Sequence, residues 1–462
     1  MKKSQQSLFE EDPAAWELDA AAHAVIATVV MPKGPDGEFD YLVPDAMLDQ
    51  RHKAAFLEPG RRVKVAFGRG NRLAMGYCVA VGLKAPPTRK LKSIAEVIDA
   101  ETLLTPAMLR LTRWMADYYL CPWGQVLEAV VPAGVRGQAG TREVVLLSVP
   151  TRVAARLTQL KLSAKQREVL EALAVSPKPL TLKQLAMRAG CTSGPIAALR
   201  KQGLIESRTE RLDLGELDAV DVARESPKML NDDQTTALRE INRALDASQH
   251  QTILVHGVTG SGKTEVYIQA IEKVVSFGRQ AIVLVPEISL TPQTVGRFRA
   301  RFDHIAVLHS HLSDVERHRH WRRIASGQVQ VVVGARSAVF APTPNLGLIV
   351  LDEEHENTFK QDSAPRYHAR EVARQRALAE GLPLVLASAT PSLESWRRAE
   401  TGEYKLLSMP KRVNDWPMPA VRLVDLREEE NRRGALSRPL VQAIDEALRD
   451  GGQAILLLNR RG

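Results

Sequence analysis

One stretch of eight residues, 257–264, constrains the fold of this chain more than any other. It reads Gly-Val-Thr-Gly-Ser-Gly-Lys-Thr, follows the apolar run 252–255 and precedes a helical pattern that starts at Glu265. Strand, glycine-rich loop and helix form the context of a phosphate-binding P-loop, in which backbone N–H groups and a helix N-terminus surround phosphate oxygens. A glycine-rich turn without a ligand is the alternative. We expect a nucleotide site built from Gly257, Thr259, Gly260, Ser261, Gly262, Lys263 and Thr264.

The same stretch and a later carboxylate pair carry the expected catalytic chemistry. Lys263 would reach the β- and γ-phosphates, and the Thr264 hydroxyl would ligate Mg²⁺. Asp352 and Glu353 close another apolar run, and strands of such sheets present functional groups at their C-terminal ends. We expect Asp352 to hold Mg²⁺ and Glu353 to orient and deprotonate the attacking water, unless the pair is only a solvated strand end.

Residues 229–415 alternate short apolar runs with helical segments, which predicts an α/β lobe with a parallel sheet of the RecA-like type. The predicted strands are 252–256, 281–285, 305–308, 329–333, 348–351 and 384–387. Ser388 and Thr390 follow the last of these and would couple the γ-phosphate state to a bound strand. Gln234, upstream of the loop, would read adenine with its amide or is simply a surface helix residue. Residues 416–462 read as the incomplete start of a second lobe, with strands at 421–426 and 454–458 around a helix at 439–448.

The N-terminal half predicts smaller units. After a polar, disordered tail at 1–20, strand patterns at 25–30, 39–44, 62–67 and 76–81 predict a small β-domain over 21–105. Its basic cluster is either a solvated face or a DNA contact; its members are Arg61, Arg62, Lys64, Arg69 and Arg72.

Residues 106–215 are expected to form a winged-helix domain, which opens with a helix that starts at Pro106. The pattern over 161–212 is that of a winged helix, used for DNA contact or only for packing, and 216–228 is a linker. Four aromatic residues that accompany the helix starting at Pro106 are interpreted as core; they are Trp114, Tyr118, Tyr119 and Trp123.

Composition narrows the setting of this multidomain chain. It has 63 Lys and Arg against 54 Asp and Glu, a formal charge of +9, which permits a nucleic-acid partner without requiring one. The three cysteines, Cys78, Cys121 and Cys191, lie far apart in the sequence. Neither a disulfide framework nor a zinc site is therefore expected, and the count suits a reducing cytoplasm. No signal peptide or membrane span is recognisable. Five histidines gather within 304–320, either as a metal site or as a polar loop and helix.

The ordered motifs resemble superfamily 2 helicases of the DExH type, and most closely the family of primosomal replication-restart helicases. Besides the P-loop and Asp352, the segments that carry the resemblance are 284–293, 334–340, 352–355, 366–370, 388–391 and 458–462, together with Phe39-Asp40-Tyr41 and Phe67-Gly68. The resemblance covers the chain from about residue 22. It implies an ATP-dependent 3′→5′ DNA helicase that recognises stalled forks and initiates primosome assembly.

The resemblance also assigns DNA-binding residues. A pocket for the 3′ end of a nascent strand falls on Phe39, Asp40, Gly68 and Lys92, where ring stacking, a hydroxyl acceptor and a phosphate contact fit the chemistry. A loop that senses single-stranded DNA falls on Phe359, Arg366, Tyr367 and Arg370, with Lys360 and His368 beside them, and Arg336 is a further DNA contact. This sequence has Pro365 where the family usually has Trp.

Parts of the family pattern are absent from this sequence, which has neither the zinc-binding insertion nor the arginine finger of the second lobe. ATP and Mg²⁺ are the expected cofactors, and zinc is expected for the full family without ligands here. Forked and single-stranded DNA, primosome proteins and single-stranded-DNA-binding protein are the expected partners of a cytoplasmic monomer. The alternatives are a fork-binding scaffold that does not hydrolyse ATP, and a winged-helix regulator with a P-loop sensor domain.

Overall fold

The structure is a computed structural model, and it describes residues 24–49, 55–68, 70–84, 91–137, 139, 141–150, 153, 156, 160, 162–176, 179–213, 223–413, 420–427 and 436–457. The expected tail 1–20, Arg69, most of the expected linker 216–228 and the final segment 458–462 lie outside the described residues. The chain divides into two compact units, residues 1–411 and 412–462.

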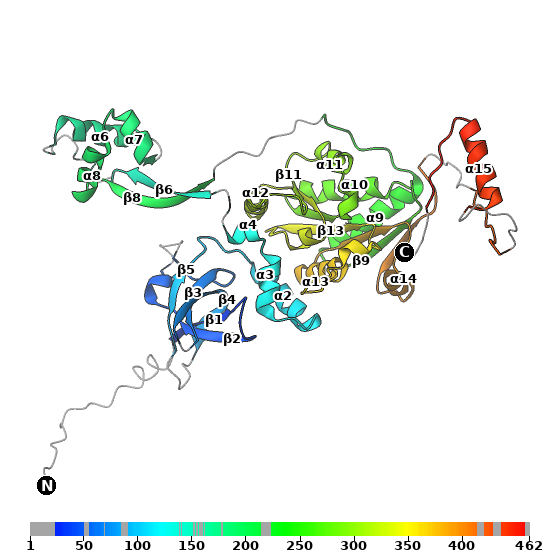
Figure 1. The fold of residues 1–462 in the computed structure, drawn as a ribbon, viewed down its shortest axis with the longest axis horizontal. Coiled ribbons are helices and arrows are strands. Elements are labelled where there is room, and N and C mark those ends of the chain that lie inside the picture. The colour runs from blue at the N-terminus through cyan, green and yellow to red at the C-terminus, as the bar shows by residue number, and fades with distance from the viewer. Residues whose placement is uncertain are drawn as a thin grey trace, which may run out of the picture. The chain divides into compact units, whose positions relative to one another are not determined.

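A seven-stranded parallel sheet forms the centre of the first unit, in the order β11-β12-β10-β13-β14-β9-β15 (Figure 1). The six predicted strands are all present, within two residues at most ends, as β9 Thr252–Gly257, β10 Gln280–Leu284, β11 Ile305–Leu308, β12 Val331–Gly334, β13 Leu346–Asp352 and β14 Leu384–Ser388. The seventh, β15 Lys405–Met409, was missed because Lys405, Leu406 and Ser408 are exposed at the sheet edge, which weakens the apolar pattern.

Alternate residues of each strand enter two different cores, as a sheet covered on both faces requires. Ile253, Val283 and Val350 point to one core, whereas Leu254, Ile282 and Ile349 point to the other. The first core packs against helices α9 Asp232–Ala247, α10 Lys263–Ser276 and α11 Pro292–Arg299. The second packs against α12 Asp314–Ala325, α13 Ala369–Glu380 and α14 Leu393–Glu400.

The predicted N-terminal β-domain is an antiparallel five-stranded sheet in the order β2-β1-β4-β3-β5. Its strands are β1 Ala24–Val30, β2 Glu38–Leu42, β3 Arg62–Phe67, β4 Arg72–Lys84 and β5 Ile94–Val97, with the short helix η1 Asp45–Met47. Two members of the predicted basic cluster are buried rather than surface groups. Arg62 is 4% exposed and donates to the Asp99 carboxylate at 2.6 Å, and Arg61 pairs with Glu58.

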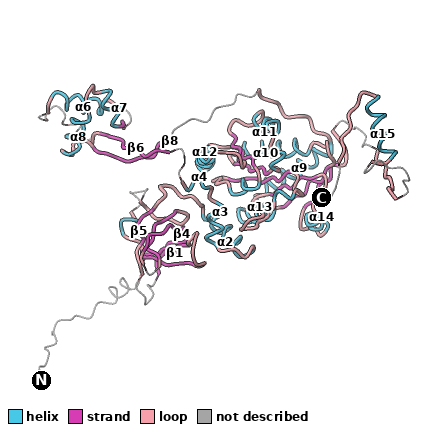
Figure 2. The backbone as a smooth tube through the Cα atoms, viewed as in Figure 1, coloured by secondary structure: helices cyan, strands magenta, loops and turns pink. Residues whose placement is uncertain are grey.

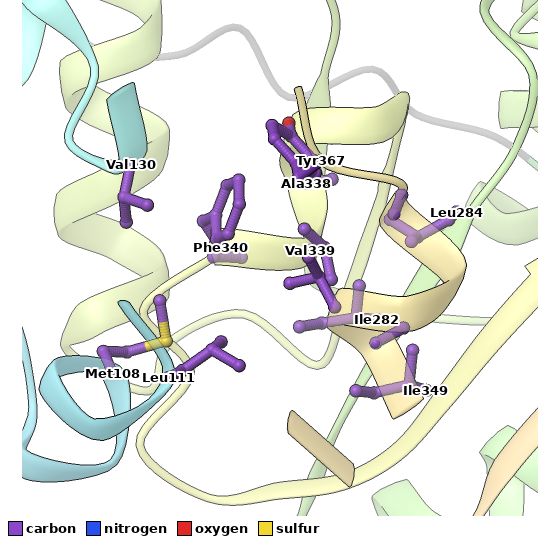
Figure 3. Packing of buried hydrophobic residues seen from close by; sticks show 14 of the residues in the cluster. Met108, Leu111, Val130, Ile282, Leu284, Ala338, Val339, Phe340, Ile349 and Tyr367 are labelled. Atoms are coloured by element: carbon purple, nitrogen blue, oxygen red, sulfur yellow. The ribbon is translucent and has the colours of Figure 1, made fainter. Parts of the chain in front are cut away.

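Three helices that follow the β-domain pack onto the second core of the lobe: α2 Pro106–Tyr118, α3 Trp123–Val130 and α4 Ala133–Arg136. Figure 3 shows Met108, Leu111 and Val130 in one cluster with Val339 and Phe340 of the lobe. Helix α4 and the start of α12 approach each other closely, because a Cβ on Gly134 would lie 2.2 Å from the carbonyl oxygen of Asp314. The sequence analysis grouped these helices with 161–212, whereas their packing joins them to the lobe.

Within the first unit, the described residues of 141–213 pack around a core of their own. Their sheet runs β7-β6-β8, and three helices gather at one end of β6 and β8 (Figure 2). The core includes Leu147, Leu170 and Leu199. The elements are β6 Thr141–Ser148, α6 Ala164–Ala174, β7 Leu180–Thr181, α7 Leu182–Arg188, α8 Ser193–Lys201 and β8 Glu206–Asp213. Ser163 and Thr181 start α6 and α7 with capping boxes. All three predicted helices are present, and the winged-helix assignment stays a prediction.

The second unit contains helix α15 Arg438–Arg449, close to the predicted 439–448. Strands were predicted at 421–426 and 454–458. The structure describes residues 421–426 and 454–457 of these, and none of them is in a strand. A strand requires a neighbouring backbone with which to form a hydrogen-bonded ladder. The described residues around α15 provide none for them.

Candidate functional site

The P-loop lies where the sequence predicts it, between β9 and α10. Gly260 and Gly262 have φ of +85° and +79°, in the left-handed region that glycine adopts without strain. At Gly257 a Cβ would lie 2.5 Å from Ser261 Oγ. The loop therefore needs glycine at these positions to fold back over the start of α10.

The centre of the loop has the polar groups that a phosphate would contact. Lys263 is 8% exposed, and its ammonium donates to the Gly257 carbonyl oxygen at 2.8 Å. Ser261 Oγ is buried and finds no partner among the described residues. Since a phosphate oxygen would replace the Gly257 carbonyl as acceptor for Lys263, the loop fits a nucleotide phosphate. Thr264 follows at the first turn of α10.

Gln234 is buried beside the P-loop, so the alternative of a surface helix residue is wrong. It is 3% exposed, its Nε2 donates to the Ser261 carbonyl oxygen at 3.1 Å, and its Oε1 accepts from the backbone N–H of Asn231. Both ends of the amide are engaged, one of them with the P-loop. Gln234 thus braces the loop, and adenine recognition by this side chain stays a prediction that requires these bonds to exchange.

Asp352 is the last residue of β13, and Glu353 follows it. Both lie at the C-terminal ends of the parallel strands, where β9 also leads into the P-loop. Tyr267 donates from its hydroxyl to Asp352 Oδ2 at 2.8 Å. Burial raises the pKa of Asp352, and the Tyr267 hydrogen bond opposes that rise. Glu353 has a φ of +48°, so the chain turns sharply and Glu353 N donates to Asp352 Oδ1.

The sequence analysis missed Tyr267. It follows Lys263 by four residues, so the two share one face of α10. A tyrosine four residues after the P-loop lysine is therefore a sequence signal from which this residue could have been predicted.

Ser388 lies beside this carboxylate segment at the end of the neighbouring strand β14. Its hydroxyl is 2.8 Å from His355 Nδ1 and accepts from the backbone N–H of Thr390 at 3.0 Å. The segments 352–355 and 388–390 are therefore joined by a direct side-chain hydrogen bond, between His355 and Ser388. This contact gives the predicted coupling role of Ser388 and Thr390 a physical route, while the role itself stays a prediction.

A buried carboxylate of the same segment, Glu354, is held by α13 and by the start of α14. Glu354 is fully buried and accepts from Arg370 at 2.8 Å, from Ser392 N at 2.7 Å and from Ser395 Oγ at 2.8 Å. Arg370, predicted to contact DNA, is 6% exposed and also donates to Ser392 Oγ. A phosphate would have to displace Glu354 to reach this guanidinium.

The predicted single-strand loop is closed against the protein. Phe359 and Tyr367 are 1% and 2% exposed, and the Tyr367 ring packs edge-on against Phe340 at 5.1 Å. Arg336 donates to the carbonyl oxygens of Thr358 and Lys360. Neither ring presents an open face to a base in this structure. Arg366, by contrast, is exposed.

The four residues of the predicted 3′-end pocket lie on neighbouring parts of the β-domain. Phe39 packs edge-on against Phe67 at 5.0 Å, and Lys92 Nζ donates to the Gly68 carbonyl oxygen at 2.8 Å. Asp40 accepts from Thr28 at 2.8 Å and from Lys84 at 3.3 Å. Thr28 and Lys84 were missed, because strand pairing across β1, β2 and β4 brings them to Asp40.

The two expected Mg²⁺ ligands both carry oxygen donors. Thr264 and Asp352 provide a hydroxyl and a carboxylate, oxygen ligands that suit Mg²⁺. Among the described residues no group of three or more His, Cys, Asp or Glu side chains is placed to hold a metal ion, the histidines of 304–320 included. None of the described helices combines the length and apolarity that a membrane crossing requires.

Two family matches cover the two sites. Residues 28–132 match the 3′DNA-binding domain (3′BD), and residues 231–399 match the DEAD/DEAH box helicase family. Replication restart protein PriA of Bacillus subtilis is 35% identical over 95% of this chain and 62% of its own length. The protein of the same name from Haemophilus influenzae is 36% identical over 92% of this chain and 57% of its own length.

Over most of its length the chain is similar to the replication restart proteins PriA. It spans 57% to 62% of the length of the first four curated relatives. Among solved structures, the helicase domain of Pyrococcus furiosus Hef is similar at 19% identity and a TM-score of 0.30 over 39% of each chain. That score is too low to add to the assignment. A helicase domain of the DEAD/DEAH type uses ATP and Mg²⁺ in general, which agrees with the P-loop chemistry.

Proposed function

We propose that this chain is an ATP-dependent 3′→5′ DNA helicase of replication restart, which recognises abandoned forks and starts primosome assembly. One observation carries the proposal: Lys263, Asp352 and Ser388 meet on one edge of the sheet in a chain that also matches a 3′DNA-binding domain. The names of the relatives supply the restart context. The domain limits, the winged helix and the cytoplasmic location stay predictions within this proposal.

Hydrolysis would use groups that the sheet already brings together. Lys263 would hold the β- and γ-phosphates, and Glu353 would take the proton from the attacking water at its carboxylate. Thr264 and Asp352 would hold Mg²⁺, which when bound neutralises charge on the phosphate oxygens. Tyr267 fixes the Asp352 carboxylate through its 2.8 Å hydrogen bond.

DNA binding would begin at the β-domain. Phe39 would stack a terminal base, Asp40 would accept from the 3′-hydroxyl, and Lys92 would meet a phosphate. The contact from Lys92 to Gly68 keeps the ammonium at the pocket. Primosome proteins and single-stranded-DNA-binding protein are the further partners that the family resemblance implies.

The deciding experiment is the ATPase rate of this chain with and without a forked DNA whose leading strand ends in a 3′-hydroxyl. The proposal expects turnover that rises with the fork and is lost in Lys263→Ala, while fork binding survives in that variant. Lys273→Ala, a lysine at the far end of the same helix, is the matched control. Tight fork binding without turnover would instead support the fork-binding scaffold. Absence of fork binding, or specific binding to one duplex sequence, would refute both.

A further inference from the structure

Next to the candidate single-strand loop, whose aromatic rings are buried, helix α2 ends with an exposed aromatic ring. Phe359 and Tyr367 of the loop are buried, whereas Tyr118 at the end of α2 is 57% exposed. Leu120, two residues later, is 91% exposed with a φ of +48°. The sequence analysis interpreted Tyr118 as core, and the structure overturns that interpretation.

The exposed ring is part of an ordered stack. Trp114 and Tyr118 lie one helical turn apart, with ring centroids at 4.9 Å and an interplanar angle of 21°. Tyr119 meets the Tyr118 ring edge-on at 4.9 Å. One face of Tyr118 is thus covered by Trp114, and the exposed remainder of the ring can extend the stack by one further flat group.

The stack is fixed to the loop by direct contacts. Tyr119 accepts from the backbone N–H of His368 at 3.1 Å, and Lys360 Nζ lies 5.5 Å from the centre of the Tyr119 ring. Lys360 also donates to the Arg366 carbonyl oxygen at 2.5 Å. The loop therefore places the Lys360 ammonium beside the aromatic stack, and the exposed Arg366 belongs to the same loop.

Helix α2 also contacts the β-domain, through the residue directly before Trp114. Arg113 donates to Glu38 at 2.7 Å, and Glu38 directly precedes Phe39 and Asp40 on β2. Arg113 also pairs with Asp117, so its charge is shared between two carboxylates. Arg113 is therefore already paired, whereas Lys360 and Arg366 of the loop are exposed. Through Arg113 and the adjoining Tyr119, α2 contacts both the strand that carries the candidate 3′-end pocket and the candidate single-strand loop.

We infer that Trp114, Tyr118 and Tyr119 form a stacking platform for unpaired nucleotides, with Lys360 and Arg366 contacting the phosphates. The ligand class is single-stranded DNA, because flat aromatic faces beside cations accept any base and the sugar–phosphate chain together. This inference rests on the proposed function and adds a binding surface to it. The loop then supplies cations, and α2 supplies the rings.

The test uses the full chain and an oligodeoxythymidine that carries a 3′-phosphate, so that a 3′-hydroxyl pocket contributes nothing. Fluorescence anisotropy should show that Tyr118→Ala weakens binding roughly 5- to 150-fold, the range for loss of one base–aromatic stack. Tyr118→Phe should bind as the wild type does. Phe277→Ala is the matched control, since Phe277 is an aromatic ring of similar exposure (64%) beside a lysine, Lys273, at the end of another helix of the lobe.

Salt dependence separates the two kinds of contact. Arg366→Gln should lower the slope of log affinity against log salt by about 0.7, the value for one phosphate contact on a single strand, whereas Tyr118→Ala should leave the slope unchanged. An oligonucleotide with 5-iodouracil should photocrosslink to the tryptic peptide 114–136. This readout needs no substitution and stays valid if a variant folds poorly.

Two outcomes would overturn the inference separately from the proposed function. Wild-type affinity in Tyr118→Ala, with normal binding of the wild-type chain, would remove the platform and leave the helicase proposal intact. Crosslinks only at other peptides would do the same. If the wild-type chain binds neither the blocked oligonucleotide nor the fork, the proposed function fails and the platform with it.

Discussion

Replacing Glu354 by Gln should destabilise the helicase lobe strongly, although Glu354 is not expected to touch ATP or DNA. Its carboxylate is fully buried and compensates Arg370, which is 6% exposed. Glutamine keeps the shape and one acceptor oxygen but removes the charge. The Arg370 guanidinium would then be a buried cation whose remaining partners are the peripheral carboxylates Glu371 and Glu394 at longer range.

The magnitude follows from the burial of the pair. Removing one partner of a buried ion pair costs about 3–5 kcal/mol, and glutamine should fall near the lower value because Ser392 N keeps an acceptor. For a body of this size, 1 kcal/mol corresponds to roughly 2–4 °C in Tm, so the transition should fall by about 6–12 °C. Arg397→Gln is the control, since the Arg397–Glu400 pair is exposed and should contribute less than ~1 kcal/mol.

The assay is differential scanning calorimetry of the whole chain. The relevant transition is the one that rises when Mg²⁺ and a non-hydrolysable ATP analogue are added, because a ligand stabilises the state that binds it. The double variant Glu354→Gln/Arg370→Met should recover a large part of the loss, since it removes the uncompensated charge. A fall of less than about 2 °C in Glu354→Gln, or no recovery in the double variant, would refute this account of the pair.

Three further predictions concern the other sites. Tyr267→Phe should weaken ATP binding ~10- to 100-fold in Mg²⁺ and leave binding in EDTA unchanged, because only the orientation of Asp352 is lost; equal loss in both would contradict this. Asp40→Ala should weaken binding to forks with a 3′-hydroxyl by roughly 10- to 150-fold and binding to 3′-phosphate forks much less, and an equal loss on both would remove Asp40 from the pocket. Burial lowers the pKa of His320 to about 4. As the pH falls, this histidine therefore takes up a proton in the unfolded chain before it does so in the folded chain. The contribution of neutral His320 to stability is therefore complete above pH ~6.5 and falls as the pH drops toward 4, by about 2 kcal/mol at pH ~5. His320→Gln should flatten urea-unfolding stability over this interval, whereas the exposed His304→Gln should not.

The strands, the P-loop and Asp352 could be predicted because their signals are local. An apolar run ending in a glycine-rich loop, or in carboxylates, fixes both the strand and the edge at which its groups emerge. Six strands of the central sheet followed from such runs alone. The edge strand β15 did not, since a strand with exposed residues lacks a continuous apolar pattern.

The exposure of individual polar and aromatic residues could not be predicted, because it depends on partners far away in the chain. Arg62 is buried by Asp99, and Arg370 by Glu354. Tyr119 meets the backbone of His368, 249 positions later. A basic or aromatic residue reads the same in the sequence whether it is a ligand contact or a buried partner, so Arg370 and Tyr367 were assigned to DNA and Tyr118 to the core.

Because β6 pairs with β8, residues 141–213 form a segment, here called the cassette, that could be removed from the chain without separating the parts on either side of it. Thr141 lies opposite Asp213 at the end of the ladder, so the chain leaves this unit beside the point at which it enters. Its core shares no member with the one that joins α2–α4 to the lobe. A short glycine-serine bridge in place of the cassette should therefore leave the remaining body folded. Fork affinity before and after that excision would give the contribution of the cassette to DNA binding directly.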